Sequence, residues 1–234
     1  MPPTVEIQSL FKYYRKQTIL RDINFSVPEK CIVAILGGNG SGKTTLLKIV
    51  AGLLPFERGH VRVFDASPGS ALARQKTAFL PENPYFAETL SGRELLKLFS
   101  RMDGHDAANE TFEAVGFKTE WLPLRLSQYS KGMLQRFNLL QFSLGKRDLL
   151  LLDEPMSGLD PLAREQMAAA LMRWKNEGKT ILFSSHLLAD VETLCDDLVL
   201  LKEGKVLFYG SAAELLKKTE TVSLFEAYRT VAAK

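Results

Sequence analysis

The sequence GGNGSGKT at residues 37–44 follows directly on the apolar run CIVAIL at residues 31–36. The apolar run predicts a buried strand, and the segment after it has the spacing G-x-x-x-x-G-K-[ST]. The glycines allow backbone N–H groups to approach phosphate oxygens closely, because no side chains stand in the way. A helix that begins at the end of this loop directs its partly positive N-terminus at the same anion. We therefore expect a strand, a phosphate-binding loop and a helix in this order, which indicates an α/β fold.

The residues of this loop have expected roles in holding a nucleotide. Lys43 supplies positive charge to the outer phosphates, and Thr44 offers a hydroxyl ligand for Mg²⁺. The alternative is a flexible glycine loop without a ligand, and the position of the motif directly after a predicted strand argues against it. The predicted nucleotide-binding residues of the segment are Gly37, Gly38, Asn39, Gly40, Ser41, Gly42, Lys43, Thr44 and Thr45.

The composition is typical of a soluble globular protein. The 234 residues are 46% hydrophobic and 24% charged, and the net charge of +3 gives no sequence-wide basic field for nucleic acid. Both cysteines, Cys31 and Cys195, lie in apolar stretches and are expected to be buried reduced thiols, which fits a cytosolic compartment. No apolar run is long enough to cross a membrane. We expect neither a nucleic-acid partner nor a membrane span in this chain.

Apolar patterns predict two kinds of sheet. The first thirty residues alternate apolar and polar in VEIQSLFKY and ILRDINFSV, which predicts an antiparallel layer that VRVF at 61–64 could extend. Near the C-terminus, LVLL, KEGK and VLFYG predict a hairpin. Four short apolar runs indicate strands buried on both faces of a parallel sheet: AILG after Cys31, TAFLP at 77–81, LLLLD at 149–153 and TILFSSH at 180–186.

A long insertion at residues 84–145 has helical periodicity and predicts a separate helical lobe. The rest of the chain, residues 1–83 and 146–234, forms the predicted core. In the lobe, Ser91 and Glu94 have the spacing of a capping box at the start of a helix. The apolar face expected to follow consists of Leu95, Leu96, Leu98, Phe99 and Met102.

Further helices are expected inside and after the lobe. Gly104 ends the first helix, and a second helix from near Asp106 to Gly116 turns Phe112 and Val115 inward. A third helix begins after Ser130. Beyond the lobe, the predicted helices are one that Pro161 opens and Gly178 closes, and one at residues 187–195.

Two adjacent carboxylates, Asp153 and Glu154, end the apolar run LLLLD. They lie at the carboxyl edge of a predicted strand, where open α/β sheets bind ligands. We expect Asp153 to help hold Mg²⁺ and Glu154 to orient and activate an attacking water. Adjacent acids at the end of a strand are otherwise usually a solvated turn. The phosphate-binding loop upstream favours the catalytic interpretation.

With the loop and the acidic pair, the chain resembles the ATP-binding subunits of ABC transporters over nearly its whole length. Tyr14 in LFKYYRK lies where that family stacks an aromatic ring on adenine, although Tyr13 and a plain sheet-surface role are alternatives. YSKGMLQR at 129–136 lies at the place of the family signature, SGLD at 157–160 resembles the D-loop, and His186 matches the switch histidine. The resemblance implies a P-loop NTPase core of RecA type, ATP and Mg²⁺ as ligands, and ATP hydrolysis as the activity.

The resemblance also implies a dimer. In the family, the signature binds the γ-phosphate of a nucleotide held by the opposite subunit. Ser130 and Gly132 are therefore expected to contact ATP across an interface with a second copy of this chain or with a related ATPase subunit, and Asp160 is expected near the partner's site. The catalytic residues that the resemblance implies are Lys43, Glu154 and His186.

Two motifs depart from the usual family pattern. Glu82, in FLPENP, stands where the family more often has glutamine. Glutamate accepts hydrogen bonds from water or binds Mg²⁺ but cannot donate, so its expected place beside the metal ligands Thr44 and Asp153 rests on the resemblance. Lys131 and Met133 replace the second small residue and the glutamine of the signature. Lys131 either adds positive charge near the γ-phosphate or is a solvated lysine.

The sequences LPE and YSKGM resemble most the exporter branch often called ABC-2, whose ATPases drive separate permeases. The expected partner is a membrane permease, and the expected location is cytoplasmic, peripheral on the cytoplasmic face of the cell membrane. A groove by Glu82, with Pro84, Tyr85 and Phe86, would receive a short permease helix, or these aromatic residues pack within the lobe. A soluble ABC ATPase without a permease and a nucleotide-gated clamp without turnover are the alternatives. The intact catalytic residues argue against the clamp.

Overall fold

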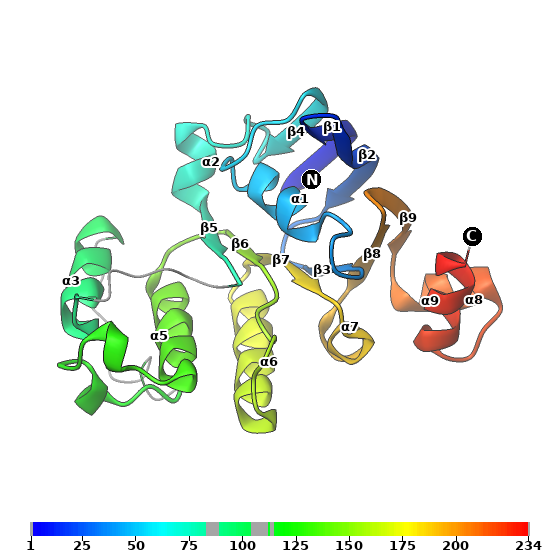
Figure 1. Cartoon of the computed structure of the whole chain (residues 1–234). Coiled ribbons are helices and arrows are strands. Elements are labelled where there is room, and N and C mark those ends of the chain that lie inside the picture. The colour runs from blue at the N-terminus through cyan, green and yellow to red at the C-terminus, as the bar shows by residue number, and fades with distance from the viewer. Residues whose placement is uncertain (1, 83–88, 104–111, 113–114, 234) are drawn as a thin grey trace. The chain divides into compact units, whose positions relative to one another are not determined.

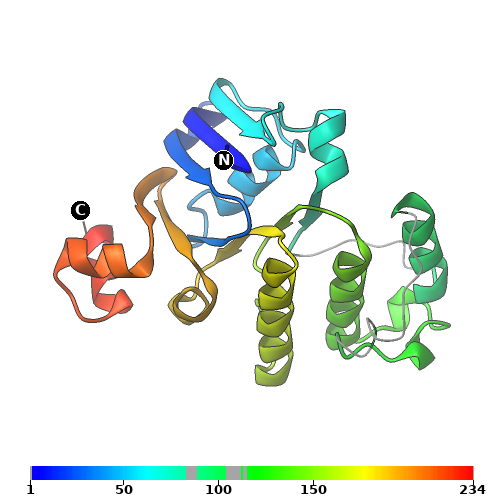
Figure 2. The same ribbon diagram turned by 180° about the vertical axis from the view of Figure 1, so that it is seen from behind.

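The computed structural model describes residues 2–82, 89–103, 112 and 115–233. The chain divides into two compact units, which Figures 1 and 2 show from opposite sides. The core unit comprises Met1–Pro81, Arg147–Pro155 and Lys175–Lys234, and the helical unit comprises Glu82–Lys146 and Met156–Trp174. The helical unit thus includes residues 156–174 in addition to the insertion at 84–145 that the sequence predicts. The predicted domain bounds themselves stay a prediction.

The core unit contains a six-stranded sheet with the strand order β5-β6-β7-β3-β8-β9. Its first five strands in this order run parallel, and β9 pairs antiparallel with β8. Every residue of β3, β6 and β7 is buried, as strands covered on both faces require. The predicted parallel sheet and hairpin are confirmed. The bounds are β3 (Ile32–Leu36), β5 (Thr77–Leu80), β6 (Leu149–Leu152), β7 (Thr180–Ser185), β8 (Asp197–Lys202) and β9 (Lys205–Gly210).

A three-stranded antiparallel sheet with the order β2-β1-β4 forms a second layer of the core unit. Its strands are β1 (Val5–Tyr14), β2 (Gln17–Val27) and β4 (Arg58–Val63), which confirms the predicted antiparallel layer and its third strand. This strand begins three residues before the predicted 61–64 and ends before Phe64. Ile7 of β1 and Val33 of β3 belong to one hydrophobic core. That core also contains Leu46, Leu47, Ile49 and Val50 of α1 (Lys43–Val50), so burial fixes the helix that follows the glycine-rich loop.

The other helices of the core unit are α2 (Ala71–Lys76), α7 (Leu188–Leu194), α8 (Ala212–Thr219) and α9 (Leu224–Ala232). The helix predicted at 187–195 is confirmed as α7, whereas the sequence did not indicate α2, α8 or α9. Cys31 and Cys195 are both free thiols, and burial raises the pKa of Cys31 to about 12, which keeps it protonated. Among the described residues, no helix combines the length and the apolar character that a membrane span needs.

The helical unit contains α3 (Gly92–Asp103), α5 (Lys131–Leu144) and most of α6 (Pro161–Asn176), with 3₁₀ turns at Thr119–Trp121 and Leu126–Gln128. Its interior holds a cluster of aromatic rings in which Phe117 contacts Trp121, Tyr129 and Phe137 at centroid distances of 5.3, 6.1 and 5.5 Å. Rings of this size bury a large apolar area in a small lobe, and their tilted and edge contacts are favourable. The inserted helical lobe is therefore confirmed as a packed structure.

The predicted details of the lobe are partly right. The capping box is present, because the Glu94 N–H donates to the Ser91 hydroxyl and the Ser91 N–H donates to the Glu94 carboxylate. The expected apolar face of α3 is wrong at Leu98, whose side chain is 48% exposed. Phe112 is buried as expected, and Gly116 has a φ of 63°, a left-handed conformation suited to a helix end. Gly104 and Asp106 lie outside the described residues, as do Pro84, Tyr85 and Phe86.

Candidate functional site

The glycine-rich loop is packed against neighbouring residues at Gly37 and Gly42 and is open at its rim, at Gly38 and Gly40. A Cβ atom at Gly37 would lie 2.3 Å from the Leu201 carbonyl oxygen, and one at Gly42 would lie 2.7 Å from a Leu20 methyl group. At Gly38 and Gly40 a Cβ atom would meet nothing within 4 Å. The loop backbone is therefore packed against the core on one side and open on the other. This is the arrangement that lets a bulky anion approach backbone N–H groups.

A buried hydroxyl in this loop lacks a partner. The Ser41 Oγ atom is buried and makes no hydrogen bond among the described residues. Buried polar atoms without partners are rare in folded proteins and call for an explanation such as a missing ligand. The orphaned hydroxyl, the open rim at Gly38 and Gly40, and the α1 N-terminus all fit a phosphate group. The chemistry of the loop thus agrees with the predicted nucleotide.

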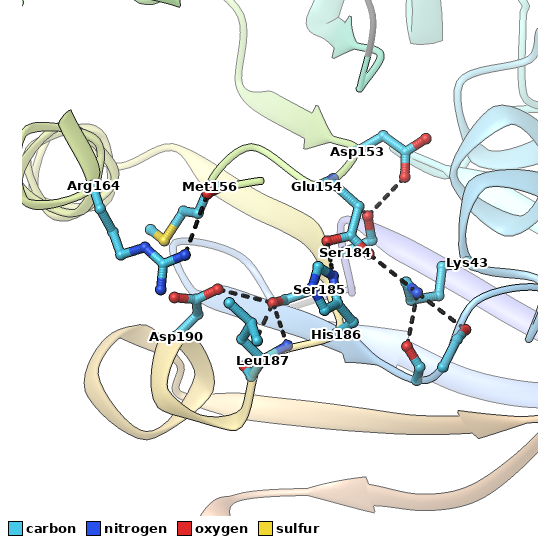
Figure 3. Close-up of polar contacts among 12 residues, drawn as sticks. Lys43, Asp153, Glu154, Met156, Arg164, Ser184, Ser185, His186, Leu187 and Asp190 are labelled. Carbon is cyan, nitrogen blue, oxygen red and sulfur yellow. Dashed lines mark hydrogen bonds and ion pairs between the residues drawn. The ribbon is translucent and has the colours of Figure 1, made fainter. Parts of the chain in front are cut away.

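The side chain of Lys43 contacts two carbonyl groups of the loop and the carboxylate of Glu154. Its Nζ atom donates to the carbonyl oxygens of Gly37 at 2.7 Å and Gly38 at 3.2 Å, and it lies 3.1 Å from Glu154 Oε1 (Figure 3). The side chains of Lys43 and Glu154 are only 7% and 10% exposed. An entering phosphate must therefore compete with a carboxylate and two carbonyl groups for this ammonium group.

Glu154 links Lys43 to His186. Its second oxygen, Oε2, lies 2.8 Å from His186 Nδ1, and because an ionised carboxylate only accepts, Nδ1 carries the hydrogen in this contact. The backbone of Glu154 has a φ of 48°, a left-handed conformation that is uncommon outside glycine. Strained backbone of this kind persists only where the surroundings enforce it, and it clusters at functional sites. The structure thus brings the three predicted catalytic residues into one contact chain.

Ser184 contacts the carboxylate of Asp153 and the backbone of Glu154, and sequence reasoning missed it. Its hydroxyl donates to Asp153 Oδ1 at 2.7 Å and accepts from the Glu154 backbone N–H at 2.8 Å. Ser184 is fully buried in β7, next to β6, which ends just before Asp153. The signal in the sequence was a pair of serines within the otherwise apolar run TILFSSH. A hydroxyl in a buried strand needs a partner, and the neighbouring strand supplies it.

The turn that presents His186 is held by a second buried network (Figure 3). The Ser185 hydroxyl accepts from the Leu187 backbone N–H at 3.0 Å and donates to Asp190 Oδ2 at 2.9 Å. Ser185 and Asp190 are 3% and 4% exposed, whereas the His186 side chain is 43% exposed. The backbone around His186 is therefore fixed, while its ring remains accessible to a ligand.

The predicted metal ligands offer oxygen atoms of the kind Mg²⁺ prefers. Thr44 supplies a hydroxyl and Asp153 a carboxylate, both hard oxygen donors. Among the described residues, no group of three or more His, Cys, Asp or Glu side chains is placed to hold a metal by itself. This fits Mg²⁺ bound by one or two protein groups together with phosphate oxygens. Glu82 is exposed and belongs to the helical unit, so its metal contact stays a prediction.

The structure distinguishes the two tyrosines at the end of β1. The Tyr13 ring stacks on Phe11 with centroids 6.4 Å apart, so it has a structural neighbour on the sheet. The Tyr14 side chain is 51% exposed, and the Lys12 ammonium lies 5.3 Å from its ring centroid. Tyr14 is therefore the ring that is open to a ligand, and its contact with adenine stays a prediction.

The remaining predicted site residues lie in the helical unit. Ser130 is the N-cap of α5, and its hydroxyl accepts from the Met133 backbone N–H at 3.2 Å. The preceding residue anchors this helix start, because the buried Tyr129 donates its hydroxyl to the Trp121 carbonyl at 2.8 Å, and burial raises the pKa of Tyr129 to about 12. Gly132 follows in the first turn. Asp160 caps α6 by accepting from the Ala163 N–H at 2.8 Å.

Comparisons with known proteins agree with this geometry. A family model described as ABC transporter matches residues 20–157. An uncharacterised ABC transporter ATP-binding protein of Synechocystis is 37% identical over 230 residues, which cover 92% of this chain and 65% of the relative. The lantibiotic transport ATP-binding protein of Streptococcus pyogenes is 32% identical over 231 residues, which cover 96% of this chain and 100% of the relative. The chain thus spans just under two thirds of the Synechocystis relative but all of the streptococcal one.

A solved structure supports the same similarity. It is described as the ATP-binding subunit of an ABC transporter and is 29% identical to this chain, with a TM-score of 0.90. The match covers 98% of this chain and 99% of that structure. The backbone of both units is therefore similar to that of the solved protein.

Proposed function

This chain belongs to the ABC transporter family, and from that membership we propose that it hydrolyses ATP to power a separate membrane permease. The contact chain from Lys43 through Glu154 to His186 carries the proposal. It combines a cation for the outer phosphates, a carboxylate that can take a proton from water, and an imidazole that holds the carboxylate. Hydrolysis of a phosphoanhydride needs groups of these kinds.

In the proposed reaction, Lys43 leaves Glu154 and binds the outer phosphates. Glu154 then takes a proton from a water molecule whose oxygen attacks the γ-phosphorus. The bond from this phosphorus to the bridging oxygen breaks, and ADP keeps the electron pair. His186 orients the carboxylate and is exposed enough to reach the γ-phosphate. Thr44 and Asp153 would hold Mg²⁺, which would neutralise charge at the phosphates when bound.

We further propose that two copies, or this chain and a related subunit, close around the nucleotide. Ser130 is exposed and lies at the N-terminus of α5, where the helix dipole favours an anion. The Ser130 hydroxyl accepts from its own helix but can still donate its hydrogen to a phosphate oxygen. In the dimer, this group and the Gly132 N–H bind the partner's γ-phosphate, with Asp160 near the same site. Loss of the γ-phosphate then releases the closed state.

The proposed partner is a membrane permease, with the chain on the cytoplasmic face of the membrane. Export is proposed from the ABC-2-like sequences LPE and YSKGM, and the name of the streptococcal relative, which describes lantibiotic transport, supports a role in transport. The support for a separate permease is that the relatives are named as the ATP-binding proteins of transporters. The cargo is then selected by the permease rather than by this chain.

The test of the ATPase proposal is Glu154→Gln, which keeps the size of the side chain but removes its negative charge. ATP binding is retained, and phosphate release falls by about 10²–10⁴-fold, the range for loss of a general base. The matched control is Glu192→Gln, an exposed glutamate on α7, which keeps wild-type turnover. Wild-type turnover by Glu154→Gln would remove this residue from the catalytic assignment.

Membrane fractionation tests the permease part separately. We expect the chain to sediment with membranes when its permease is present and to dissociate as an active ATPase when the membrane protein is removed. An ATPase that never associates with any membrane protein would contradict the permease proposal and leave the hydrolytic one intact.

A further inference from the structure

Glu57 is tied to the end of β1 by contacts with consecutive residues. Its Oε1 accepts from Lys12 Nζ at 2.8 Å, and its Oε2 accepts from the Tyr13 backbone N–H at 2.8 Å. The Glu57 backbone N–H in turn donates to the Phe11 carbonyl at 3.2 Å. The β1–β4 ladder ends at the pair Phe11–Arg58. The contacts of Glu57 therefore extend the pairing between the two segments beyond Phe11–Arg58, as far as Tyr13. Tyr14 is the residue of β1 that follows Tyr13.

Lys12 connects this contact to the Tyr14 ring. Ser9 has a φ of 45° and interrupts the register of β1, and beyond it Leu10, Lys12 and Tyr14 alternate onto one face of the strand. Leu10 is fully buried in the same core as α1, so this is the inner face of the sheet. Lys12 is only 4% exposed, and its ammonium lies over the Tyr14 ring.

Because Lys12 is buried, its positive charge needs Glu57 as a partner. A buried ammonium without a partner is unfavourable, because its hydration is lost. The hydrogen bond from Lys12 is the main cause that holds the pKa of Glu57 below its usual value, so the carboxylate is ionised at neutral pH. The ion pair with Glu57 fixes the Lys12 ammonium group above one face of the Tyr14 ring. The cation–π attraction between the ammonium group and the ring then restrains the ring. Only the other face of the ring is then free for a planar ligand.

We propose that Glu57 and Lys12 are positioning residues that hold the Tyr14 ring for adenine, and that this pair sets how strongly the site prefers ATP to a phosphate chain without a base. The inference rests on the proposed function, in particular on the contact of Tyr14 with the base. It adds a clamp, formed by Glu57 and Lys12, that acts only on the base end of the nucleotide. The phosphate end is held by the glycine-rich loop and does not depend on the clamp.

Titration calorimetry with ATP and with inorganic tripolyphosphate separates the two ends. Tyr14→Ala weakens ATP binding by about 5- to 100-fold, the range for loss of a base stacked on an aromatic ring. Glu57→Gln and Lys12→Met each weaken ATP binding by about three- to tenfold, because a misplaced ring loses part of the same stacking. In all three variants the affinity for tripolyphosphate is unchanged, which a merely destabilised protein would not show.

A double variant and a matched control complete the experiment. If Glu57 acts through Lys12, the variant Glu57→Gln with Lys12→Met loses no more ATP affinity than either single variant. Asp65→Asn breaks the exposed ion pair between Arg62 and Asp65 in the same β layer and leaves both affinities unchanged.

Each contrary result has a distinct meaning. If Tyr14→Ala weakens ATP selectively while Glu57→Gln does not, the clamp is overturned and the base contact of Tyr14 stands. If Glu57→Gln weakens ATP and tripolyphosphate equally, the residue is structural and the clamp is likewise overturned. If Tyr14→Ala changes neither affinity, the base contact fails, and the clamp fails with it. A nucleotide site independent of Lys43 would instead contradict the proposed function itself.

Discussion

Helices α1 and α5 both begin at predicted phosphate-binding motifs, but their N-termini differ. The N-cap of α1 is Gly42, which has a φ of 109° and no side chain to occupy the first N–H groups of the helix. The N-cap of α5 is Ser130, whose hydroxyl accepts from the Met133 N–H. Lys43 and the Glu154–His186 pair surround the first N-terminus. The second N-terminus offers a hydroxyl, the polarised N–H groups of a helix and a small residue, Gly132.

The two helix starts are therefore suited to different tasks, catalysis at α1 and anion binding at α5. The N-terminus of α1 lies among groups that can bind charge and move a proton, whereas that of α5 has groups that can only bind an anion. Each motif belongs to a different compact unit. A site that needs both can be completed by the α5 motif of a second chain, as the proposed dimer requires. Substitutions at the two helix starts should therefore fail in different ways.

Among substitutions at the two helix starts, the largest expected effect is that of Lys43→Ala. Removal of the ammonium eliminates charged hydrogen bonds to the outer phosphates, so ATP affinity falls by about a hundredfold. Titration calorimetry measures it, with Lys48→Ala, in the last turn of α1, as the control. Because Lys43 is paired with Glu154, Glu154→Gln frees the ammonium group and should bind ATP more tightly than the wild type. Unchanged affinity in Lys43→Ala would mean that the α1 motif is not the phosphate site.

Ser130→Arg tests the other helix start. A bulky side chain at this N-cap blocks approach of the partner's γ-phosphate, so turnover falls by at least about tenfold while ATP still binds to the core unit. In the Glu154→Gln background, light scattering should show an ATP-dependent dimer that Ser130→Arg abolishes. Ser223→Arg alters the comparable N-cap of α9 and is the control for loss of a cap. Full activity of Ser130→Arg would refute the shared site.

Much of the fold could be predicted because local patterns report burial directly. The apolar runs before Gly37 and Asp153 are strands buried on both faces, as is typical of a parallel sheet covered on both sides. Local sequence patterns could not predict the order of the strands in the sheet. The place of β8 beside β3 depends on pairing between distant segments. The exposed Leu98 shows the same limit, because helical periodicity identifies an apolar face without showing whether a neighbour covers it.

The same distinction between local patterns and long-range pairing applies to the residues of the candidate site. The glycine spacing and the Asp153–Glu154 pair are local in sequence, so the phosphate-binding loop and the acidic pair could be predicted. Ser184 and Glu57 could not, because their roles depend on neighbours that pairing brings close. Ser184 bonds Asp153 across adjacent strands, and Glu57 contacts β1 residues more than forty positions earlier in the chain. Sequence patterns show the groups that do chemistry more readily than those that position them.

A smaller effect is expected from Ser184→Ala. The substitution removes the hydroxyl that receives the Glu154 N–H and donates to Asp153, so the strained backbone of Glu154 loses one restraint. Turnover should fall by about tenfold, the factor for a loss of about 1.4 kcal/mol, which is at the upper end of the range for a single ordinary hydrogen bond. ATP affinity, measured by calorimetry, should change little. Ser70→Ala removes the cap of α2 in the same unit and should leave turnover unchanged. Wild-type turnover in Ser184→Ala would show that the carboxylates hold their positions without it.

The smallest expected effect comes from comparing Ser130→Ala with Ser211→Ala. Both serines cap a helix by accepting a backbone N–H at 3.2 Å, from Met133 in α5 and from Glu214 in α8. Loss of either cap should cost about 1 kcal/mol of stability, which thermal unfolding measures. Only Ser130→Ala should also lower ATP turnover, because the proposed dimer uses its hydroxyl as a donor to the γ-phosphate. If the two variants kept equal turnover, Ser130 would be an N-cap like any other, and the anion site of α5 would rest on its backbone alone.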